Sequence, residues 1–359
     1  MTLRLPRDLW GVYRQPPQFR FGTVTSVSPG ICTVQVAGGE IPVIYFKNAA
    51  QSVGDFVSVQ RQSVVSYLMT APVAGALWVG DGALFGIWRV PTSGSDPVFY
   101  SIPSATVRGV ALGPDKAIWA FGSSATGQTY VWRMVSSGPE IGDVTDAQIP
   151  YVVPYDIAPG PADSLWFSGD QYVLQVTTAF AVTEFAPAGM NQMLGIVEGP
   201  DGNLWMSEDQ GYLARMTPTG VTTVFSLSGQ SLGPFGICVG PDGNIWVAST
   251  GFGVWRSTLS GGTTYFPIAG SQLQNIVAGP DGNLWATDAN SLVWKVTLAG
   301  DATSYSIPNS TPTGIAAGSD KNLWVSDSAN GGVWQVTPAG NTAFFGLPGS
   351  APSSICAGP

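Results

Sequence analysis

The sequence predicts an all-β protein, in which a closed ring of seven four-stranded units follows a small barrel of short strands. One stretch, Gly199-Pro-Asp-Gly-Asn-Leu-Trp205, recurs at residues 240–246 and 279–285 and, altered, at 113–119 and 318–324. Seven tryptophans are spaced by 41, 47, 39, 41, 39 and 39 residues, namely Trp78, Trp119, Trp166, Trp205, Trp246, Trp285 and Trp324. A period near 40 indicates stacked units, each too small to bury its own apolar face.

Composition and charge support the all-β class and limit the kinds of molecule that the protein could bind. Charged residues are 10% of the 359 residues, and 46 glycines and 28 prolines punctuate short apolar runs, which is typical of strands joined by turns. Residues 1–75 contain six Lys or Arg and three Asp or Glu, whereas the rest contains eight and twenty. The large domain is therefore acidic, and we expect no nucleic acid as a partner.

One residue type and two kinds of segment are not found in the sequence. The chain contains no histidine. It has three cysteines, Cys32, Cys238 and Cys356, which is an odd number, and they lack the spacing of metal ligands. We therefore expect no disulfide framework and no cofactor. The N-terminus lacks the apolar region of a signal peptide, and no run reaches the roughly 18 apolar residues of a membrane helix. We expect no membrane insertion; release by lysis, as for virion proteins, stays open.

The N-terminal fifth is expected to contain an arm and a barrel. Residues 1–19 are irregular, with Arg4, Arg7 and Arg14 and the aromatic residues Trp10 and Tyr13, and would be either a frayed terminus or an arm that orders by docking. Residues 20–72 contain five apolar runs separated by glycine-rich turns, which predict a small barrel. The expected strands are 21–27, 31–36, 41–46, 56–60 and 64–69.

Three runs in this segment resemble a known kind of barrel. Gly22–Val27, Thr33–Val36 and Val53–Val59 are similar to the oligonucleotide/oligosaccharide-binding (OB)-type barrels of bacteriophage tail and baseplate proteins. The resemblance implies assembly with other phage tail proteins through residues 1–72, a location in the virion tail after synthesis in the host cytoplasm, and a homo-oligomer, because tail tips have ring symmetry. Ligand binding on the barrel is not expected, since basic and aromatic residues do not line its strands.

From residue 73 to 359 each unit fits one template of four strands. At 235–268 the strands are expected at 235–239, 245–249, 254–258 and 263–268, with Pro241-Asp-Gly-Asn244 as a tight turn. Four such strands form one blade of a β-propeller. Second tryptophans on the third strands, Trp88, Trp132, Trp255, Trp294 and Trp334, are interpreted as packing between blades.

The two ends of this domain complete one blade. The C-terminal residues 354–359 are expected to form an innermost strand that lacks the other strands of its blade. Those strands stand at the beginning of the domain, starting at Ala76-Leu77-Trp78. The last strand would therefore complete the first blade and close a seven-bladed ring without open sheet edges.

The repeated motifs resemble those of the virginiamycin B lyase family, which linearises streptogramins. The Gly-Pro-Asp-Gly-Asn-Leu-Trp motif, the following Trp-Lys/Arg-Val-Thr and the Thr-x-Tyr/Phe-x-Ile-Pro element carry this similarity over residues 73–359. The resemblance implies catalysis by a histidine with a glutamate and a magnesium ion on the top face, near the channel. The histidine position, at the start of an innermost strand, holds no histidine in any blade: the residues are Arg108, Tyr155, Leu194, Phe235, Gln274, Thr313 and Ser353.

The position at the end of the second strand keeps carboxylates in four blades: Asp81, Glu208, Asp288 and Asp327. Without a histidine, no side chain has an unperturbed pKa near neutral pH, so we predict no catalytic residue. Top-face ligand contacts are expected from Arg108, Tyr155, Phe235, Gln274 and Glu208. A cation held by Asp81, Asp288 and Asp327 is a hypothesis, and the alternative is that these aspartates only form turns.

Three functions follow. The first is a minor tail protein of a phage tail tip, with the propeller displayed to recognise a host-surface saccharide or protein, or serving architecture alone. The second is a divergent lyase or hydrolase that uses the retained carboxylates. The third is a propeller scaffold that binds a protein. We favour the first, because it also accounts for the tail-like barrel.

Overall fold

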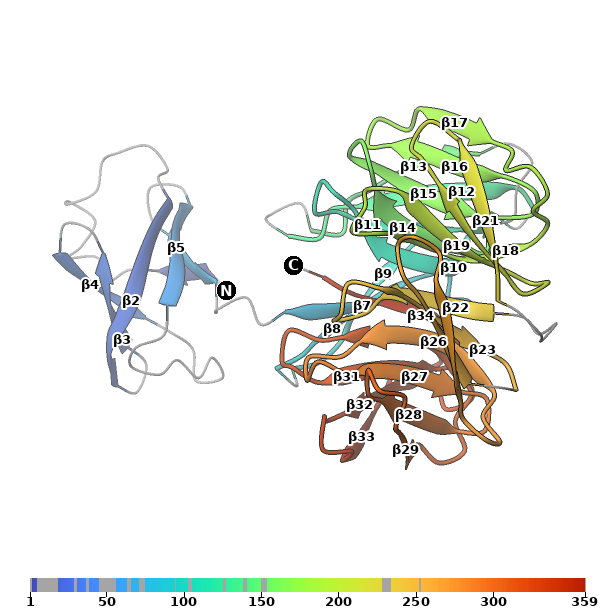
Figure 1. Cartoon of the computed structure of the whole chain (residues 1–359). Coiled ribbons are helices and arrows are strands. Elements are labelled where there is room, and N and C mark those ends of the chain that lie inside the picture. Colours follow the sequence, from blue (N-terminus) through green and yellow to red (C-terminus); the bar gives the residue numbers. More distant parts are fainter. Residues whose placement is uncertain are drawn as a thin grey trace. The chain divides into compact units, whose positions relative to one another are not determined.

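The computed structural model describes residues 2–4, 19–28, 31–36, 39–44, 56–62 and 66–70, and 75–358 except 94, 103–104, 125–126, 138–140, 150–153, 228–233 and 252. The chain divides into two compact units, Met1–Ala74 and Gly75–Pro359 (Figure 1). Among the described residues, no helix has the length and apolar character needed to cross a membrane.

The first unit contains one antiparallel sheet with the strand order β1-β6-β5-β2-β3-β4. Its strands are β1 (Thr2–Arg4), β2 (Phe19–Ser28), β3 (Ile31–Val36), β4 (Gly39–Ile44), β5 (Phe56–Gln62) and β6 (Ser66–Thr70). The five predicted strands correspond to β2 to β6. Strand β1 was not predicted; it lies in the segment expected to be irregular, and Thr2 pairs with Leu68 of β6. The side chains and connections of this unit lie outside the described residues, so the OB-like barrel stays a prediction.

The second unit is a seven-bladed β-propeller, as predicted, with each blade an antiparallel sheet of four strands. Blade 1 contains β34 (Pro352–Ala357), β7 (Ala76–Asp81), β8 (Gly86–Pro91) and β9 (Val98–Ser101); blade 2, β10 (Ala105–Leu112), β11 (Ile118–Ser124), β12 (Thr129–Met134) and β13 (Val144–Gln148); blade 3, β14 (Asp156–Gly160), β15 (Ser164–Ser168), β16 (Val173–Thr177) and β17 (Val182–Phe185). Blade 4 contains β18 (Met193–Glu198), β19 (Leu204–Glu208), β20 (Tyr212–Met216) and β21 (Thr222–Ser226); blade 5, β22 (Pro234–Val239), β23 (Ile245–Ser249), β24 (Gly253–Ser257) and β25 (Thr263–Pro267). Blade 6 contains β26 (Leu273–Ala278), β27 (Leu284–Asp288), β28 (Leu292–Val296) and β29 (Ala302–Ser306); blade 7, β30 (Pro312–Ala317), β31 (Leu323–Asp327), β32 (Gly332–Val336) and β33 (Thr342–Gly346).

The C-terminal strand closes the ring. Strand β34 pairs antiparallel with β7, with Cys356 opposite Trp78 and Ile355 opposite Val79, so the two ends of the domain share blade 1. The innermost strands contact one another in the cyclic order β34, β10, β14, β18, β22, β26, β30 and back to β34. This confirms the predicted closure, which leaves no unpaired innermost strand in the described propeller.

The repeated turn is built to hold a buried tryptophan. In blade 4, Asp201 Oδ1 accepts hydrogen bonds from Trp205 Nε1 at 3.1 Å and from the Asn203 amide at 3.3 Å. A Cβ on Gly199 would stand 2.5 Å from the Trp205 ring, and Gly202 has a φ of +70°. The glycines of the motif therefore leave room for the ring or adopt positive φ, and the aspartate satisfies the indole.

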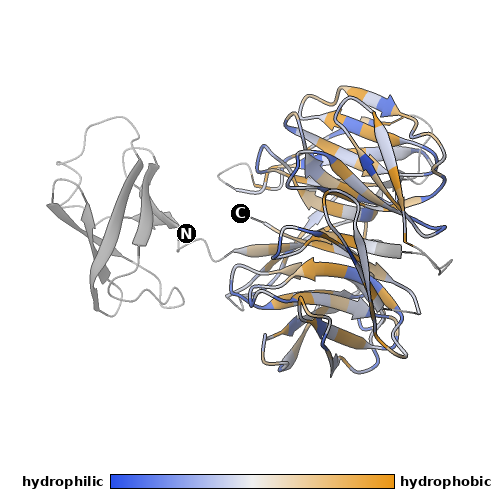
Figure 2. Ribbon diagram, in the orientation of Figure 1, coloured by the Kyte–Doolittle hydropathy of each residue, from blue (hydrophilic) through white to orange (hydrophobic). Residues whose placement is uncertain are grey.

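The seven regularly spaced tryptophans, which lie on the second strands and are called the first tryptophan ladder, form the core between blades; the tryptophans of the third strands are the second ladder. Trp119, Trp166, Trp205, Trp246 and Trp285 are fully buried. Hydrophobic clusters each combine residues of two neighbouring blades, for example Trp119 and Phe121 of blade 2 with Leu165 and Phe167 of blade 3. Figure 2 shows hydrophobic residues along the strands of the propeller. Packing between sheets is therefore what the repeat encodes, as predicted.

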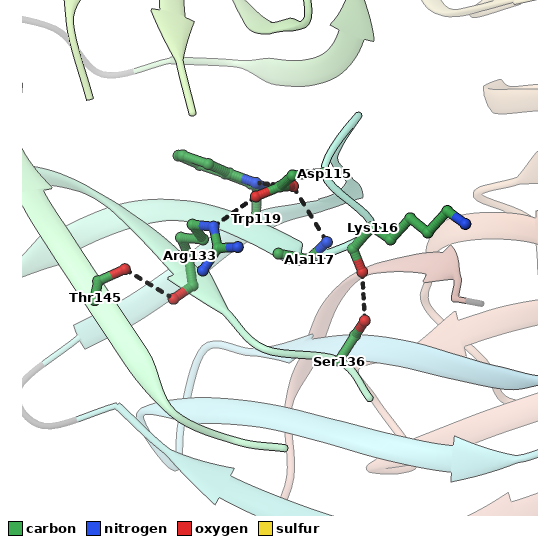
Figure 3. Close-up of polar contacts among 7 residues, drawn as sticks. All are labelled: Asp115, Lys116, Ala117, Trp119, Arg133, Ser136 and Thr145. Atoms are coloured by element: carbon green, nitrogen blue, oxygen red, sulfur yellow. Dashed lines mark hydrogen bonds and ion pairs between the residues drawn. The ribbon is translucent and has the colours of Figure 1, made fainter. Parts of the chain in front are cut away.

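Basic residues of the third strands complete the same unit. Figure 3 shows Asp115 of blade 2 accepting hydrogen bonds from Trp119 Nε1 and the Ala117 amide and pairing with Arg133. In blade 6, Lys295 Nζ lies 2.8 Å from Asp281 Oδ2 and over the Trp285 ring. Burial alone would raise the pKa of Asp281, but hydrogen bonds from Lys295, Trp285 and Asn283 lower it to about 2. These charges belong to the fold.

Candidate functional site

The innermost strands enclose a cavity of about 800 Å³, which is lined by residues from all seven blades. Of the predicted ligand contacts, Arg108, Tyr155 and Gln274 line this cavity. Phe235 lies in β22, but its side chain is outside the described residues. Leu194, Thr313 and Ser353, which occupy the same repeat position, also line it. The repeat position chosen from the sequence therefore does face the central channel.

Irregular strand pairing shapes this position. The register shifts between Val107 and Gly109 in β10 and between Met193 and Gly195 in β18, and comparable shifts occur in β22, β26, β30 and β34. A bulge of this kind re-aims a side chain. Arg108 and Leu194 occupy the irregular residues of their strands. In β14 the pairing is regular, with Asp156 opposite Ser168 and Ile157 opposite Phe167.

Asp156 is a channel residue that the sequence reasoning missed. It occupies the repeat position held by glycine in Gly109, Gly195, Gly236 and Gly314, and it lines the cavity. Its Oδ2 accepts the Ile196 amide of the next blade at 3.1 Å, and its Oδ1 accepts the Ile157 amide at 2.8 Å. Burial raises its pKa to about 6, although these two hydrogen bonds act in the opposite direction. Among the described residues that line the cavity, Asp156 is the only carboxyl group, and burial brings its pKa toward neutral pH.

Tyr155 is held by an acidic group. Its hydroxyl donates to Asp170 Oδ1 at 2.9 Å, and its side chain is 39% exposed. Burial and the hydrogen bond to Asp170 raise the pKa of Tyr155 to about 12. The phenol therefore stays protonated at neutral pH, so Tyr155 contributes an aromatic ring and a hydrogen-bonding hydroxyl to the cavity wall and does not act as a base.

The aspartates at the ends of the second strands make hydrogen bonds within their own blades. Asp288 Oδ2 accepts Trp294 Nε1 at 2.8 Å and the Gln272 amide at 2.9 Å. Asp81 and Asp327 bind Trp88 and Trp334 in the same way, each at 2.9 Å. All three carboxylates are fully buried. They cap turns and satisfy the indoles of the second tryptophan ladder.

The three aspartates of the cation hypothesis do not lie together in one group of the described residues. Each of Asp81, Asp288 and Asp327 accepts hydrogen bonds within its own part of the ring, and none lines the cavity. In the described part of the chain, no three His, Cys, Asp or Glu side chains stand close enough to share a metal ion. The turn-forming alternative is the one whose contacts are present.

Glu208, predicted as a ligand contact, is buried rather than open to the channel. It is 1% exposed, and its Oε2 accepts the Gln210 amide at 2.8 Å. Burial, together with the neighbouring Asp209, raises its pKa. Glu208 does not line the cavity, because β19 is the second strand of its blade and the innermost strand β18 separates it from the axis.

Comparison with known proteins gives the family. The model of the Virginiamycin B lyase family matches residues 52–272 and 253–359, and so covers the whole propeller. The chain belongs to the virginiamycin B lyase family. No protein of curated function matches it in sequence.

Solved structures of this family share the fold. The virginiamycin B lyase from Staphylococcus aureus is 21% identical with a TM-score of 0.64, and the match covers 70% of this chain and 88% of that one. A streptogramin B lyase is 19% identical with a TM-score of 0.65, covering 78% and 91%. A catalytically inactive form of the S. aureus enzyme, with one histidine replaced by alanine and with quinupristin, is 21% identical with a TM-score of 0.62, covering 68% and 85%.

Proposed function

We propose that this member of the virginiamycin B lyase family is a binding protein without lyase activity. The observation that carries the proposal is the absence of histidine from the whole chain. The S. aureus lyase is catalytically inactive when one histidine is replaced by alanine. In this chain the positions at the starts of the innermost strands hold other residues, among them Arg108 and Gln274 on the cavity wall.

The buried carboxylates support the same proposal. A general base must come within hydrogen-bond reach of the proton that it abstracts from the substrate. Asp81, Asp288 and Asp327 instead accept indole and backbone N–H groups and have no exposed surface. The channel instead contains hydrogen-bonding side chains around a cavity large enough for a small molecule or the end of a polymer.

We further propose that the binding propeller belongs to a bacteriophage tail, where residues 1–72 attach it to other tail proteins and the propeller recognises the host surface. The resemblance of Gly22–Val27 and Val53–Val59 to tail and baseplate barrels supports this step. Several copies around a ring-symmetric tail tip are part of the proposal.

The test is a pull-down of the labelled full chain on intact cells and purified cell walls of bacterial hosts. The proposal predicts retention by at least one envelope, reduced when Arg108 or Gln274 is replaced by alanine. Retention on no envelope, with the chain still bound to tail particles, would refute host recognition and leave an architectural propeller. Binding by a bacterial protein in place of an envelope would support the scaffold alternative.

A divergent enzyme is the second candidate, and Asp156 is the observation that favours it. A carboxyl group with a pKa of about 6 on a cavity wall has the properties of a general acid or base. The fold explains it equally well, because its two oxygens accept N–H groups of β14 and of β18 in the next blade. Turnover of any substrate that disappears in Asp156→Asn would establish this candidate.

A further inference from the structure

Two residues of opposite charge line the cavity. Among the described residues that line it, only Arg108 and Asp156 carry charged side chains. They belong to β10 and β14, which are neighbouring innermost strands in contact. The ion pairs among the described residues are Arg133 with Asp115 and Lys295 with Asp281, so Arg108 and Asp156 pair neither with each other nor with another described residue.

Both groups retain hydrogen-bonding capacity for a ligand. Arg108 is exposed, and its guanidinium has five N–H donors but makes no polar contact with the described residues. Asp156 accepts two backbone N–H groups, whereas a carboxylate offers about four lone-pair sites. The Ser354 hydroxyl on the same wall is buried and has no partner in the described part of the chain.

Another part of the wall is apolar. Leu194 and Ile196 of blade 4, which is next to blade 3, and Ile237 of blade 5 line the cavity. The cavity therefore combines a cationic group, an anionic group and an aliphatic surface, which is the arrangement of a small-molecule site. A ligand that places one charge against each group would satisfy both, because charge-assisted hydrogen bonds are stronger than neutral ones.

We propose that the channel binds a zwitterion with an aliphatic side chain, an α-amino acid or the zwitterionic end of a cell-wall peptide, with its carboxylate on Arg108 and its ammonium on Asp156. The aliphatic side chain would lie against Leu194, Ile196 and Ile237. This inference rests on the proposed binding function and names its ligand class. The cavity of about 800 Å³ leaves room beyond a single amino acid for the rest of a peptide.

Calorimetric titration of the full chain with three matched probes tests the charges. Leucine has both charges, N-acetyl-leucine lacks the ammonium group, and leucinamide lacks the carboxylate. We expect leucine to bind and each derivative to bind about tenfold more weakly or worse, the difference that a hydrogen bond to a charged group makes. A second arm uses soluble cell-wall peptide fragments with a zwitterionic end; tighter binding of these than of leucine identifies the envelope as the source.

Two variants assign the contacts. Arg108→Gln is expected to remove the preference for leucine over leucinamide and to leave that over N-acetyl-leucine, and Asp156→Asn is expected to do the reverse. Arg256→Gln is the control, because Arg256 lies over the Trp246 ring and outside the cavity lining. Thermal melts of each variant show that the fold is retained.

Failure of leucine and of the peptide fragments to bind would overturn the inference, as would binding that neither Arg108→Gln nor Asp156→Asn changes. The two proposals fail separately. Envelope retention that persists in both variants would keep host recognition but overturn the channel as its contact, whereas binding of leucine without retention on any envelope would refute host recognition and keep the channel site. Loss of envelope retention in Arg108→Gln and Asp156→Asn, with retention by Arg256→Gln, supports both.

Discussion

Asp156→Asn tests the electrostatics of the channel. The pKa of Asp156 is raised from 3.8 to about 6 in the folded chain because burial disfavours its charged form. A group whose pKa is raised on folding stabilises the fold below its unfolded pKa, and this contribution is lost as the pH rises through the folded pKa. The wild type should therefore lose stability between about pH 4 and 7 relative to Asp156→Asn, since asparagine does not titrate.

The shift of roughly two pKa units corresponds to about 3 kcal/mol, at about 1.36 kcal/mol per unit. Because Asp156 is partly exposed to solvent, which screens its charge, we expect a change of about 1–2 kcal/mol. The variant also loses one of the two accepted hydrogen bonds, a cost that is the same at every pH. Urea unfolding of both proteins at about pH 4 and 7 measures the difference, and Asp301→Asn in an exposed turn controls for the removal of one charge. Equal pH profiles for wild type and Asp156→Asn would refute the reasoning.

Three further predictions concern the fold. Gly199→Ala should destabilise the chain by about 1–3 kcal/mol, because its Cβ would stand 2.5 Å from the Trp205 ring. Gly202→Ala is the matched control: its Cβ would have no atom within 4 Å, so the substitution should cost only backbone strain. Equal urea midpoints for the two variants would contradict the packing argument. Asp281→Ala should cost about 2–3 kcal/mol at pH 7; because the folded pKa is about 2, this difference should shrink as the pH falls below about 4, and a difference independent of pH would contradict the assigned contacts. Deletion of residues 352–359 removes β34, the innermost strand of blade 1, and should abolish the cooperative melt; an unchanged melt would show that closure is dispensable.

The propeller was predictable because its turn chemistry repeats. Asp115, Asp201 and Asp281 each satisfy the indole four residues later, so one local interaction marks each of these blades. In blade 1 the aspartate is absent, and the Trp78 indole nitrogen is buried without a partner among the described residues. The motif therefore weakens where the chain ends meet, yet the order of the strands still showed how the ring closes.

The site was predicted only in part. The repeat placed Arg108 and Gln274 on the channel, because strands in equivalent positions face the same axis. Asp156 was missed, although an acidic residue stands there at a position that is glycine in four other blades. Glu208 was assigned to the surface from its place at a strand end, but burial behind β18 depends on how the sheets stack, which spacing along the chain does not encode.

Incubation of the full chain with quinupristin and magnesium tests most directly whether the protein binds without turnover. Chromatography separates the cyclic streptogramin from its linear product, with a histidine-containing family lyase as the positive control. We predict the same amount of linear product as in buffer alone. Linearisation above that background, lost in Glu208→Gln or Asp156→Asn, would contradict it and establish a lyase that works without histidine.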